Sequence, residues 1–208
     1  GKTIREQMQL RVGITLLSRI WDFGFRVIST ADKPIKSPND LNGLRIRTPV
    51  EAEFVNLFRA LQANPIAMSL NEVYPALARH QIDGQEGLLP LIPAARFQDV
   101  QKYCALSNHV WDGQWICISA NAWKSLPDTL KQVVGAAFDE AALKQRADTA
   151  DVSAKIQAAL TEGGMAFNPV DPAPFRAMLR QSGYYRDLSK RMGERYWDVL
   201  EKYTGSLV

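Results

Sequence analysis

The sequence feature that most limits the possible folds is the segment 128–162, which contains no proline and only one glycine, Gly135. Proline breaks the interior of a helix and glycine weakens it, so this composition favours a helix through the whole segment. At a rise of about 1.5 Å per residue, that helix would be roughly 50 Å long. Such a helix is long for a compact domain, and we expect it to bridge two parts of the molecule or to bend between them. The pair Gly163-Gly164 marks its end.

Short apolar segments alternate with helical patterns on either side of this segment. In residues 44–47, apolar and basic side chains alternate, which is typical of a half-buried strand. Ser69 and Glu72 form the Ser-x-x-Glu pattern of a capping box, which predicts a helix that runs to about Arg79. The opening residues, up to Ile20, predict a helix that leads into a short strand. Further helices are expected over residues 51–61, 89–97, 171–183 and 185–203, and further strands over 21–29, 64–68, 102–106, 114–119 and 165–167. This alternation favours an α/β fold with a mostly parallel sheet.

The composition excludes several classes of protein. A chain of 208 residues, 46% of them hydrophobic, is long enough to bury a core. Its 25 lysines and arginines exceed its 22 acidic residues by only three and are spread along the chain, which argues against nucleic-acid binding by bulk charge. No apolar run approaches the ~18 residues that a spanning helix needs, so we expect a protein that is not itself inserted in a membrane. The first six residues are too polar for a secretory signal.

The two cysteines, Cys104 and Cys117, are too few for a disulfide scaffold. Both lie in apolar segments with strand character, which favours buried free thiols. A single bridge between them stays open if the two strands are neighbours. The cysteine count therefore does not decide the compartment.

Most catalytic signatures are absent, including the glycine-rich phosphate loops and the Gly-x-Ser-x-Gly elbow. A histidine-built zinc site would need both His80 and His109 plus a carboxylate, but the two histidines lie in unrelated contexts, and we expect no metal and no cofactor. Cys117 and His109 make a poor nucleophile–base pair, because Cys117 lies inside an apolar strand. Asp83 or Glu86 remains as a candidate general base. In the alternative interpretation, these acids accept backbone hydrogen bonds and shape their loop.

Arginines on apolar strands beside proline and glycine are the most informative residues. Arg45 and Arg47 are two positions apart on one strand and therefore point the same way, and Pro49 redirects the chain after them. An arginine at a strand end can present its planar fork to a carboxylate through two charge-assisted hydrogen bonds. The alternative is a salt bridge to a nearby acid. Arg26 has the same two interpretations.

A set of short motifs follows in order between residues 41 and 127. The segments are Leu41-Asn42-Gly43-Leu44-Arg45-Ile46-Arg47-Thr48-Pro49, Asn71-Glu72-Val73-Tyr74-Pro75-Ala76-Leu77, Ile82-Asp83-Gly84-Gln85-Glu86, Phe97-Gln98-Asp99-Val100-Gln101-Lys102-Tyr103, Ser107-Asn108-His109 and Trp123-Lys124-Ser125-Leu126-Pro127. This ordered set resembles the extracytoplasmic solute-binding proteins of tripartite ATP-independent periplasmic (TRAP) transporters, the DctP family. The resemblance is strong over about residues 20 to 165 and looser elsewhere.

The resemblance implies a periplasmic-binding-protein-like fold: two α/β lobes with mixed, mostly parallel sheets, joined by crossing strands and a long connecting helix. The implied division is residues 1–24 as a remnant of lobe one, 25–112 as lobe two with the anchoring arginine, 113–127 as a crossing strand and lobe-one segment, 128–162 as the connecting helix, and 163–208 as a C-terminal strand and helices that pack on the lobes. Family members are longer at the N-terminus. The N-terminal part of lobe one, and any secretory signal, would then lie upstream of this sequence.

The same resemblance implies ligand-binding residues. In the family, an arginine at the position of Arg47 pairs with the ligand carboxylate, and a second arginine, at the position of Arg26, assists. Where the family commonly has an asparagine after Asp-Gly-Gln-Glu, this chain has Gly87, directly after Glu86. Where many members carry phenylalanine, Leu70 stands here. A missing amide and a smaller side chain imply a bulkier or less hydroxylated ligand. Trp111 and Trp115, on either side of an expected turn at Asp112-Gly113, are further candidates for the pocket lining.

We therefore expect a periplasmic solute-binding receptor that captures a carboxylate-bearing organic acid between two lobes and delivers it to the membrane permease subunits of a TRAP transporter. The runner-up is an enzyme that acts on a small organic acid with Asp83 or Glu86 as general base. A sensory module that uses the same cleft is a third interpretation, although no output domain is recognisable.

Overall fold

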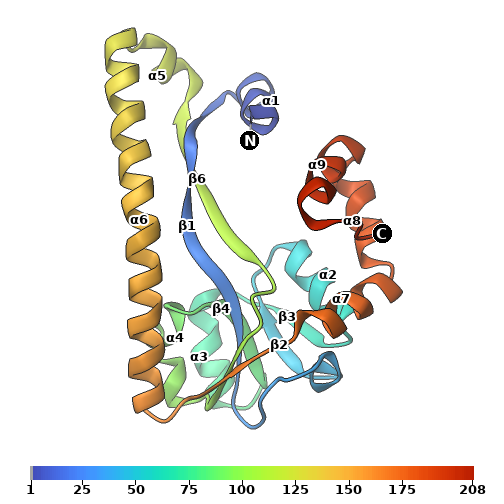
Figure 1. The fold of residues 1–208 in the computed structure, drawn as a ribbon. Helices are drawn as coiled ribbons and strands as arrows, with labels where there is room; N and C mark the ends of the chain where they lie inside the picture. Colours follow the sequence, from blue (N-terminus) through green and yellow to red (C-terminus); the bar gives the residue numbers. More distant parts are fainter. Residues whose placement is uncertain (1) are drawn as a thin grey trace. The chain divides into compact units, whose positions relative to one another are not determined.

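The computed structural model describes residues 2–208, which fold into two compact units (Figure 1). The first unit contains the chain up to Phe25 together with Val110–Gln157, and the second contains Arg26–His109 and Ala158–Val208. Strand β1 (Ile14–Thr30) and helix α6 (Asp128–Glu162) each contribute to both units. The 35-residue helix predicted from the absence of proline is thus present as one element with the expected bounds.

The first unit is a two-stranded ribbon with helices. It contains α1 (Lys2–Val12), the first part of β1, β6 (Trp111–Ser119), α5 (Ala120–Ser125) and most of α6. β1 and β6 are antiparallel from the pair Ile14–Ser119 to the pair Phe25–Trp111, with a bulge or irregularity between Asp22 and Phe25. Gly24 lies in this irregularity with φ +86°, a conformation that glycine adopts without strain.

The second unit is built on one sheet with the strand order β3-β2-β4-β1-β5-β7. Its strands are β2 (Arg45–Thr48), β3 (Asn64–Ala67), β4 (Gly84–Leu88), β5 (Tyr103–Leu106), β7 (Ala166–Pro169) and the last residues of β1. β2 is parallel to β3 and β4, and β5 is parallel to β7, while β1 is antiparallel to both β4 and β5. All described strands of this sheet except β1 therefore run in the same direction. This confirms the expected mixed, mostly parallel α/β sheet.

Helices accompany this sheet. They are α2 (Ala52–Ala60), α3 (Leu70–Ala78), α4 (Leu91–Ala94), α7 (Pro172–Gln181), α8 (Tyr184–Met192), α9 (Glu194–Thr204) and the 3-10 turns Pro38–Leu41 and Phe97–Asp99. Two of them, α8 and α9, pack on neighbouring helices and not on the strands. The core contains Ile28 and Ile46 of the sheet, Phe58 of α2, Leu77 of α3 and Phe97, none more than 2% exposed. The helix predicted after Ser69 is present: the backbone N–H of Ser69 donates to Glu72 Oε2 at 3.0 Å, as a capping box requires.

Three local predictions were wrong. The two expected N-terminal strands are one continuous 17-residue strand, β1. The helix expected over 185–203 is divided into α8 and α9 at Gly193, whose φ of +83° interrupts the helical backbone. Asp112-Gly113 is not a turn, because Gly113 lies inside β6 and pairs with Asp22.

The cysteine prediction was correct in one part and wrong in another. Both thiols are free, but only Cys104 is buried, whereas Cys117 is exposed on β6. No residue of β6 is buried, so the apolar neighbours of Cys117 do not enclose it. Within residues 2–208, no helix is long and apolar enough to cross a membrane.

Candidate functional site

The chemistry-bearing side chains of the second unit gather at the carboxyl edge of its sheet. Arg47 precedes the last residue of β2, Met68 follows β3, and Glu86 is the middle residue of the five-residue strand β4. Arg26 reaches the same edge from the opposite direction, because antiparallel β1 pairs it with Leu88 at the end of β4. In α/β sheets the carboxyl ends of parallel strands are the usual place for ligand sites, since the chain leaves the sheet there in loops.

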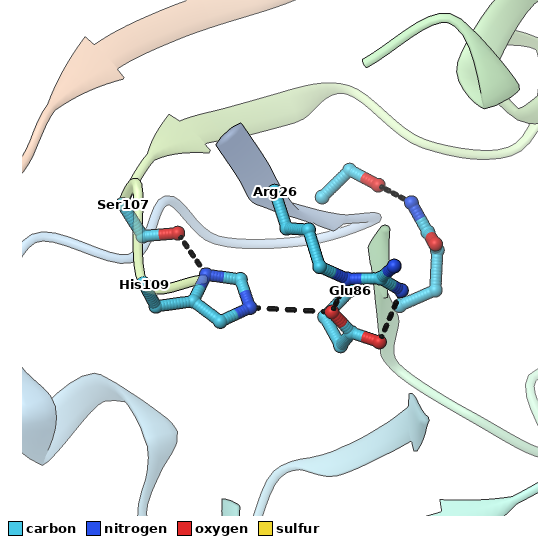
Figure 2. Close-up of polar contacts among 6 residues, drawn as sticks. Arg26, Glu86, Ser107 and His109 are labelled. Carbon is cyan, nitrogen blue, oxygen red and sulfur yellow. Dashed lines mark hydrogen bonds and ion pairs between the residues drawn. The ribbon is translucent and has the colours of Figure 1, made fainter. Parts of the chain in front are cut away.

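Arg26 and Glu86 form a buried bidentate ion pair (Figure 2). The guanidinium donates from Nε to Oε2 at 2.7 Å and from Nη2 to Oε1 at 2.8 Å, and the two side chains are 8% and 0% exposed. The face of the Phe54 ring, on α2, lies 4.5 Å from the guanidinium carbon, within the range of a cation–π contact. The planar group of Arg26 is therefore held both along its edge and on its face.

His109 extends this pair into a short chain of polar contacts, which Figure 2 shows from Ser107 to Arg26. Its Nε2 lies 3.2 Å from Glu86 Oε2, and its Nδ1 lies 2.7 Å from the Ser107 hydroxyl. The ring also packs edge-on against Phe58, with centroids 5.3 Å apart and planes at 81°. Glu86 thus has partners on both carboxylate oxygens.

These partners set the protonation of Glu86. Burial alone would raise the pKa of the Glu86 carboxyl, but the hydrogen bonds from His109 and Arg26 outweigh it and leave the pKa below its usual value of 4.5. The pKa of Asp83 is also lowered, chiefly by its hydrogen bonds from Arg45 at 2.5 and 3.1 Å. A general base needs a higher proton affinity and a free lone pair, so neither carboxylate is suited to that role.

Arg47 differs from Arg26 and Arg45, which each form an ion pair with a carboxylate. It is 5% exposed, and its Nε donates to the Met68 carbonyl oxygen at 3.0 Å. Among residues 2–208, no carboxylate lies within 4.0 Å of its guanidinium. Burial lowers the pKa of Arg47, the charge of Glu86 opposes that effect, and the charge of Arg26 adds to it. The salt bridge considered for the strand arginines is therefore present at Arg45 and Arg26 but not at Arg47.

The remaining predicted site residues fall in different places. Gly87 is buried in β4 and pairs with Val27 of β1. Leu70 is the first residue of α3 and is 38% exposed. Trp111 and Trp115 belong to β6 in the first unit, where the Trp111 indole donates to Asp22 Oδ1 at 2.8 Å. Contact of either tryptophan with a ligand stays a prediction.

Sequence reasoning missed several side chains that hold the charged and polar groups of the second unit in place. His109 and Phe54 hold the Arg26–Glu86 pair, and Gln85, Ser29 and Gln101 form a separate buried network. The one usable signal was a polar residue beside apolar ones in a strand segment, at Ser29. In the described part of the chain, no group of three or more His, Cys, Asp or Glu side chains is arranged to hold a metal ion.

Comparison with known sequences connects this geometry to one family. The family described as bacterial extracellular solute-binding protein, family 7 (DctP), matches residues 1–187. The sialic acid-binding periplasmic protein SiaP of Vibrio cholerae is 28% identical over 194 residues, which are 93% of this chain and 59% of that protein. A solute-binding protein of Roseobacter denitrificans is 34% identical over 153 residues, 74% of this chain and 47% of the relative. This chain thus spans about half of the length of these relatives.

Solved structures show the same similarity. A TRAP periplasmic solute-binding protein of Bordetella, with density assigned to pantoate, is 31% identical with a TM-score of 0.79, over 92% of this chain and 62% of that one. One from Haemophilus influenzae with bound L-gulonate is 29% identical with a TM-score of 0.83, over 97% and 65%. One from Roseobacter denitrificans with bound β-D-glucuronate is 31% identical with a TM-score of 0.81, over 92% and 64%.

Proposed function

Because the chain belongs to family 7 of the bacterial extracellular solute-binding proteins, the DctP family, we propose that it captures a small organic acid and presents it to a membrane permease. The ligand is a carboxylate-bearing molecule of the size of a sugar acid. Arg47 anchors the carboxylate, and the Arg26–Glu86 pair beside it completes the charged part of the site.

The observation that carries this proposal is the buried, acid-free guanidinium of Arg47. Transfer of a charged group from water into the protein interior costs roughly several kcal/mol of free energy unless an opposite charge or hydrogen bonds compensate it. Among residues 2–208, the only hydrogen bond that compensates Arg47 is that from Nε to the Met68 carbonyl oxygen, so both terminal amino groups remain available. They present two parallel N–H donors, which match the two oxygens of a carboxylate.

The charges around Arg47 also match a single carboxylate. Arg26, Glu86 and Arg47 together carry two positive charges and one negative charge, so the group has one net positive charge. Glu86 occupies Arg26 with two hydrogen bonds, which leaves the neighbouring Arg47 as the stronger attractor for an anion. A monocarboxylate neutralises the group, and we propose that Arg26 assists by its charge and by the fixed position that Glu86 and Phe54 impose on it.

The relatives support the chemical class of the ligand. Their solved structures contain density assigned to pantoate, bound L-gulonate and bound β-D-glucuronate, and each of these molecules carries one carboxylate with hydroxyl groups. We propose an acid of this class for the present chain. Leu70 is smaller than the phenylalanine that many family members carry, and we propose that it leaves room for a bulky substituent.

The proposed location and partner follow from the family. We propose that the protein acts in the periplasm and delivers its ligand to the membrane subunits of a TRAP transporter. The family description as extracellular and the periplasmic relatives support the location, and the TRAP structures support the partner class.

A thermal-shift screen with pantoate, L-gulonate and D-glucuronate tests the proposal. A ligand at 100 times its Kd adds about 2.7 kcal/mol to the free energy of unfolding, which raises the melting temperature by several degrees. We expect at least one acid to do so for the wild-type chain and none to do so for Arg47→Ala. The acid should be recovered chemically unchanged. Turnover of the acid, or an equal shift in Arg47→Ala, contradicts the proposal.

A further inference from the structure

A buried amide oxygen without a hydrogen-bond partner lies next to the proposed anchor. Gln85, on β4, is 0% exposed, and no described residue donates to its Oε1. Its Nε2 donates to the Ser29 hydroxyl at 2.7 Å. Ser29 in turn donates to Gln101 Oε1 at 2.7 Å, and Gln101 Nε2 donates to the Ser29 carbonyl oxygen at 2.8 Å. The amide is therefore held in one orientation while its acceptor is left unsatisfied, which is costly in a protein interior.

The absence of a side chain at Gly87 permits this orientation. Residues 85 and 87 point to the same side of β4, because they are two apart on one strand. A Cβ atom added at Gly87 would lie 2.9 Å from Gln85 Oε1, and 3.5 Å from the Leu91 side chain. The Gln85 oxygen thus takes the space in which a side chain at position 87 would begin. An alanine there would displace the amide.

The register of the sheet places Gln85 beside Arg47. The two residues are direct partners in the parallel pairing of β2 and β4, and adjacent strands lie about 4.8 Å apart. Gln85 Oε1 is directed along β4 toward Gly87, and so toward the carboxyl edge of the sheet, where Arg47 and its proposed carboxylate also lie. An amide oxygen repels a carboxylate, so the group that faces it must be a hydrogen-bond donor.

We propose that Gln85 Oε1 is a specificity-determining contact, which accepts a hydrogen bond from a hydroxyl group on the carbon next to the ligand carboxylate. The proposal rests on the carboxylate-binding function proposed above and narrows its ligand class to 2-hydroxy acids. Removal of that hydroxyl leaves the buried acceptor unsatisfied in the complex, which weakens binding by about 10- to 100-fold.

The test compares acid pairs that differ only in this hydroxyl: pantoate with 2-deoxypantoate, and L-gulonate with 2-deoxy-L-gulonate. Calorimetric titration of the wild-type chain should show the roughly 10- to 100-fold preference for the hydroxylated member. Gln85→Met removes the acceptor, and Gly87→Ala displaces it. Each variant should bind both members of a pair equally and should bind the deoxy acid about as well as the wild type does.

Gln101→Leu is the matched control, because it opens the same buried network and leaves the Ser29 hydroxyl that holds the Gln85 amide in place. It should lower the melting temperature and retain the preference. Equal binding of both members by the wild type overturns the role of Gln85 and leaves the anchoring role of Arg47 intact, as does a preference that survives in both Gln85→Met and Gly87→Ala. If neither member binds at all, the proposed function fails, and this inference fails with it.

Discussion

Three arginines in the second unit illustrate how the surroundings decide the role of one residue type. Arg45 pairs with Asp83 at a half-exposed position, and Arg26 is locked to Glu86 in the interior. Arg47 is as deeply buried as Arg26 but has only a backbone carbonyl as its partner among the described residues. A buried ion pair contributes little net stability, whereas a buried charge without an acid is a strong attractor for an anion. The residue that stabilises the fold least is therefore the best candidate for ligand binding.

Glu86→Gln tests how much the buried pair matters for stability. The substitution removes the negative charge opposite Arg26 and replaces one acceptor oxygen with an NH2 group, which cannot accept the second hydrogen bond from the guanidinium. We expect the free energy of unfolding to fall by about 3–5 kcal/mol, measured by urea denaturation. Asp83→Asn, at the half-exposed pair, is the matched control and should cost much less, because solvent screens that interaction. Equal losses in the two variants would show that burial does not strengthen the role of Glu86.

The stability of the protein should decrease in acid. The pKa of Glu86 in the folded chain lies below its usual value of 4.5, and that of Asp83 lies below 3.8. The folded state therefore holds fewer protons on these groups than the unfolded state, and their stabilising effect is complete above pH 4.5 and is lost as the pH falls through the lowered pKa values.

Urea midpoints measured from neutral pH downward should stay level to about pH 5 and then decline. In Glu86→Gln the decline should be shallower, because one of the carboxyl groups with a lowered pKa is gone. A midpoint that rises as the pH falls below 4.5 contradicts this assignment of charge.

Only part of this site was predictable from the sequence. The strand pattern before Pro49 left two interpretations open for Arg47, and the resemblance to the DctP family selected it as the expected ligand anchor. The bond between Arg26 and Glu86 joins residues 60 positions apart, and the register of β1 against β4 decides it, which no local pattern contains. No pattern around His109 predicted its role. That role comes from its two partners, Ser107 in the loop after β5 and Glu86 on β4.

At the scale of elements, the long helix α6 is tied to β1 within the first unit. Gln145 accepts from the Asp22 backbone N–H at 3.0 Å and donates to the Asp22 carbonyl oxygen at 2.5 Å, and the Thr149 hydroxyl donates to the same oxygen at 2.9 Å. These bonds satisfy the backbone N–H and carbonyl groups of Asp22, at the point where the pairing of β1 with β6 becomes irregular, between Asp22 and Phe25. Two side chains of α6, Gln145 and Thr149, thus bond the backbone of β1 at this irregularity.

Gln145→Ala should therefore loosen β1 locally. We expect the Asp22 amide to exchange its hydrogen faster and the free energy of unfolding to fall by about 1–3 kcal/mol. Lys144→Ala, at the exposed neighbouring position, is the control and should change neither quantity. Identical exchange rates at Asp22 in the two variants would show that the tie does not hold the strand.

The elements themselves were predictable where a single residue type decides them. The absence of proline predicted α6 to its ends, and the Ser69–Glu72 box predicted the start of α3. The strand and helix patterns failed where a glycine has an unusual role. Gly113, where a turn was expected, lies inside β6, whereas Gly193 takes a φ of +83° that ends α8. The sequence shows a glycine at both positions and does not show which conformation it adopts.

At the scale of the whole molecule, the sheet of the second unit explains why the site lies where it does. The parallel arrangement of β2, β3 and β4 brings their carboxyl ends to one edge, and the antiparallel direction of β1 delivers Arg26 to the same edge. The predicted alternation of strands and helices was sufficient for the fold class. The single antiparallel strand in the middle of the sheet follows from chain topology, which periodicity does not report.

The central claim is that Arg47 anchors a carboxylate through its fork of two N–H donors. The most direct measurement is calorimetric titration of pantoate, L-gulonate and D-glucuronate into the wild-type chain, Arg47→Lys and Arg45→Lys. We predict that Arg47→Lys, which keeps the charge but loses the fork, binds the preferred acid at least about tenfold more weakly. Arg45→Lys, two residues away on the same strand, should bind it as the wild type does. Unchanged affinity in Arg47→Lys, or an equal loss in Arg45→Lys, would contradict the account.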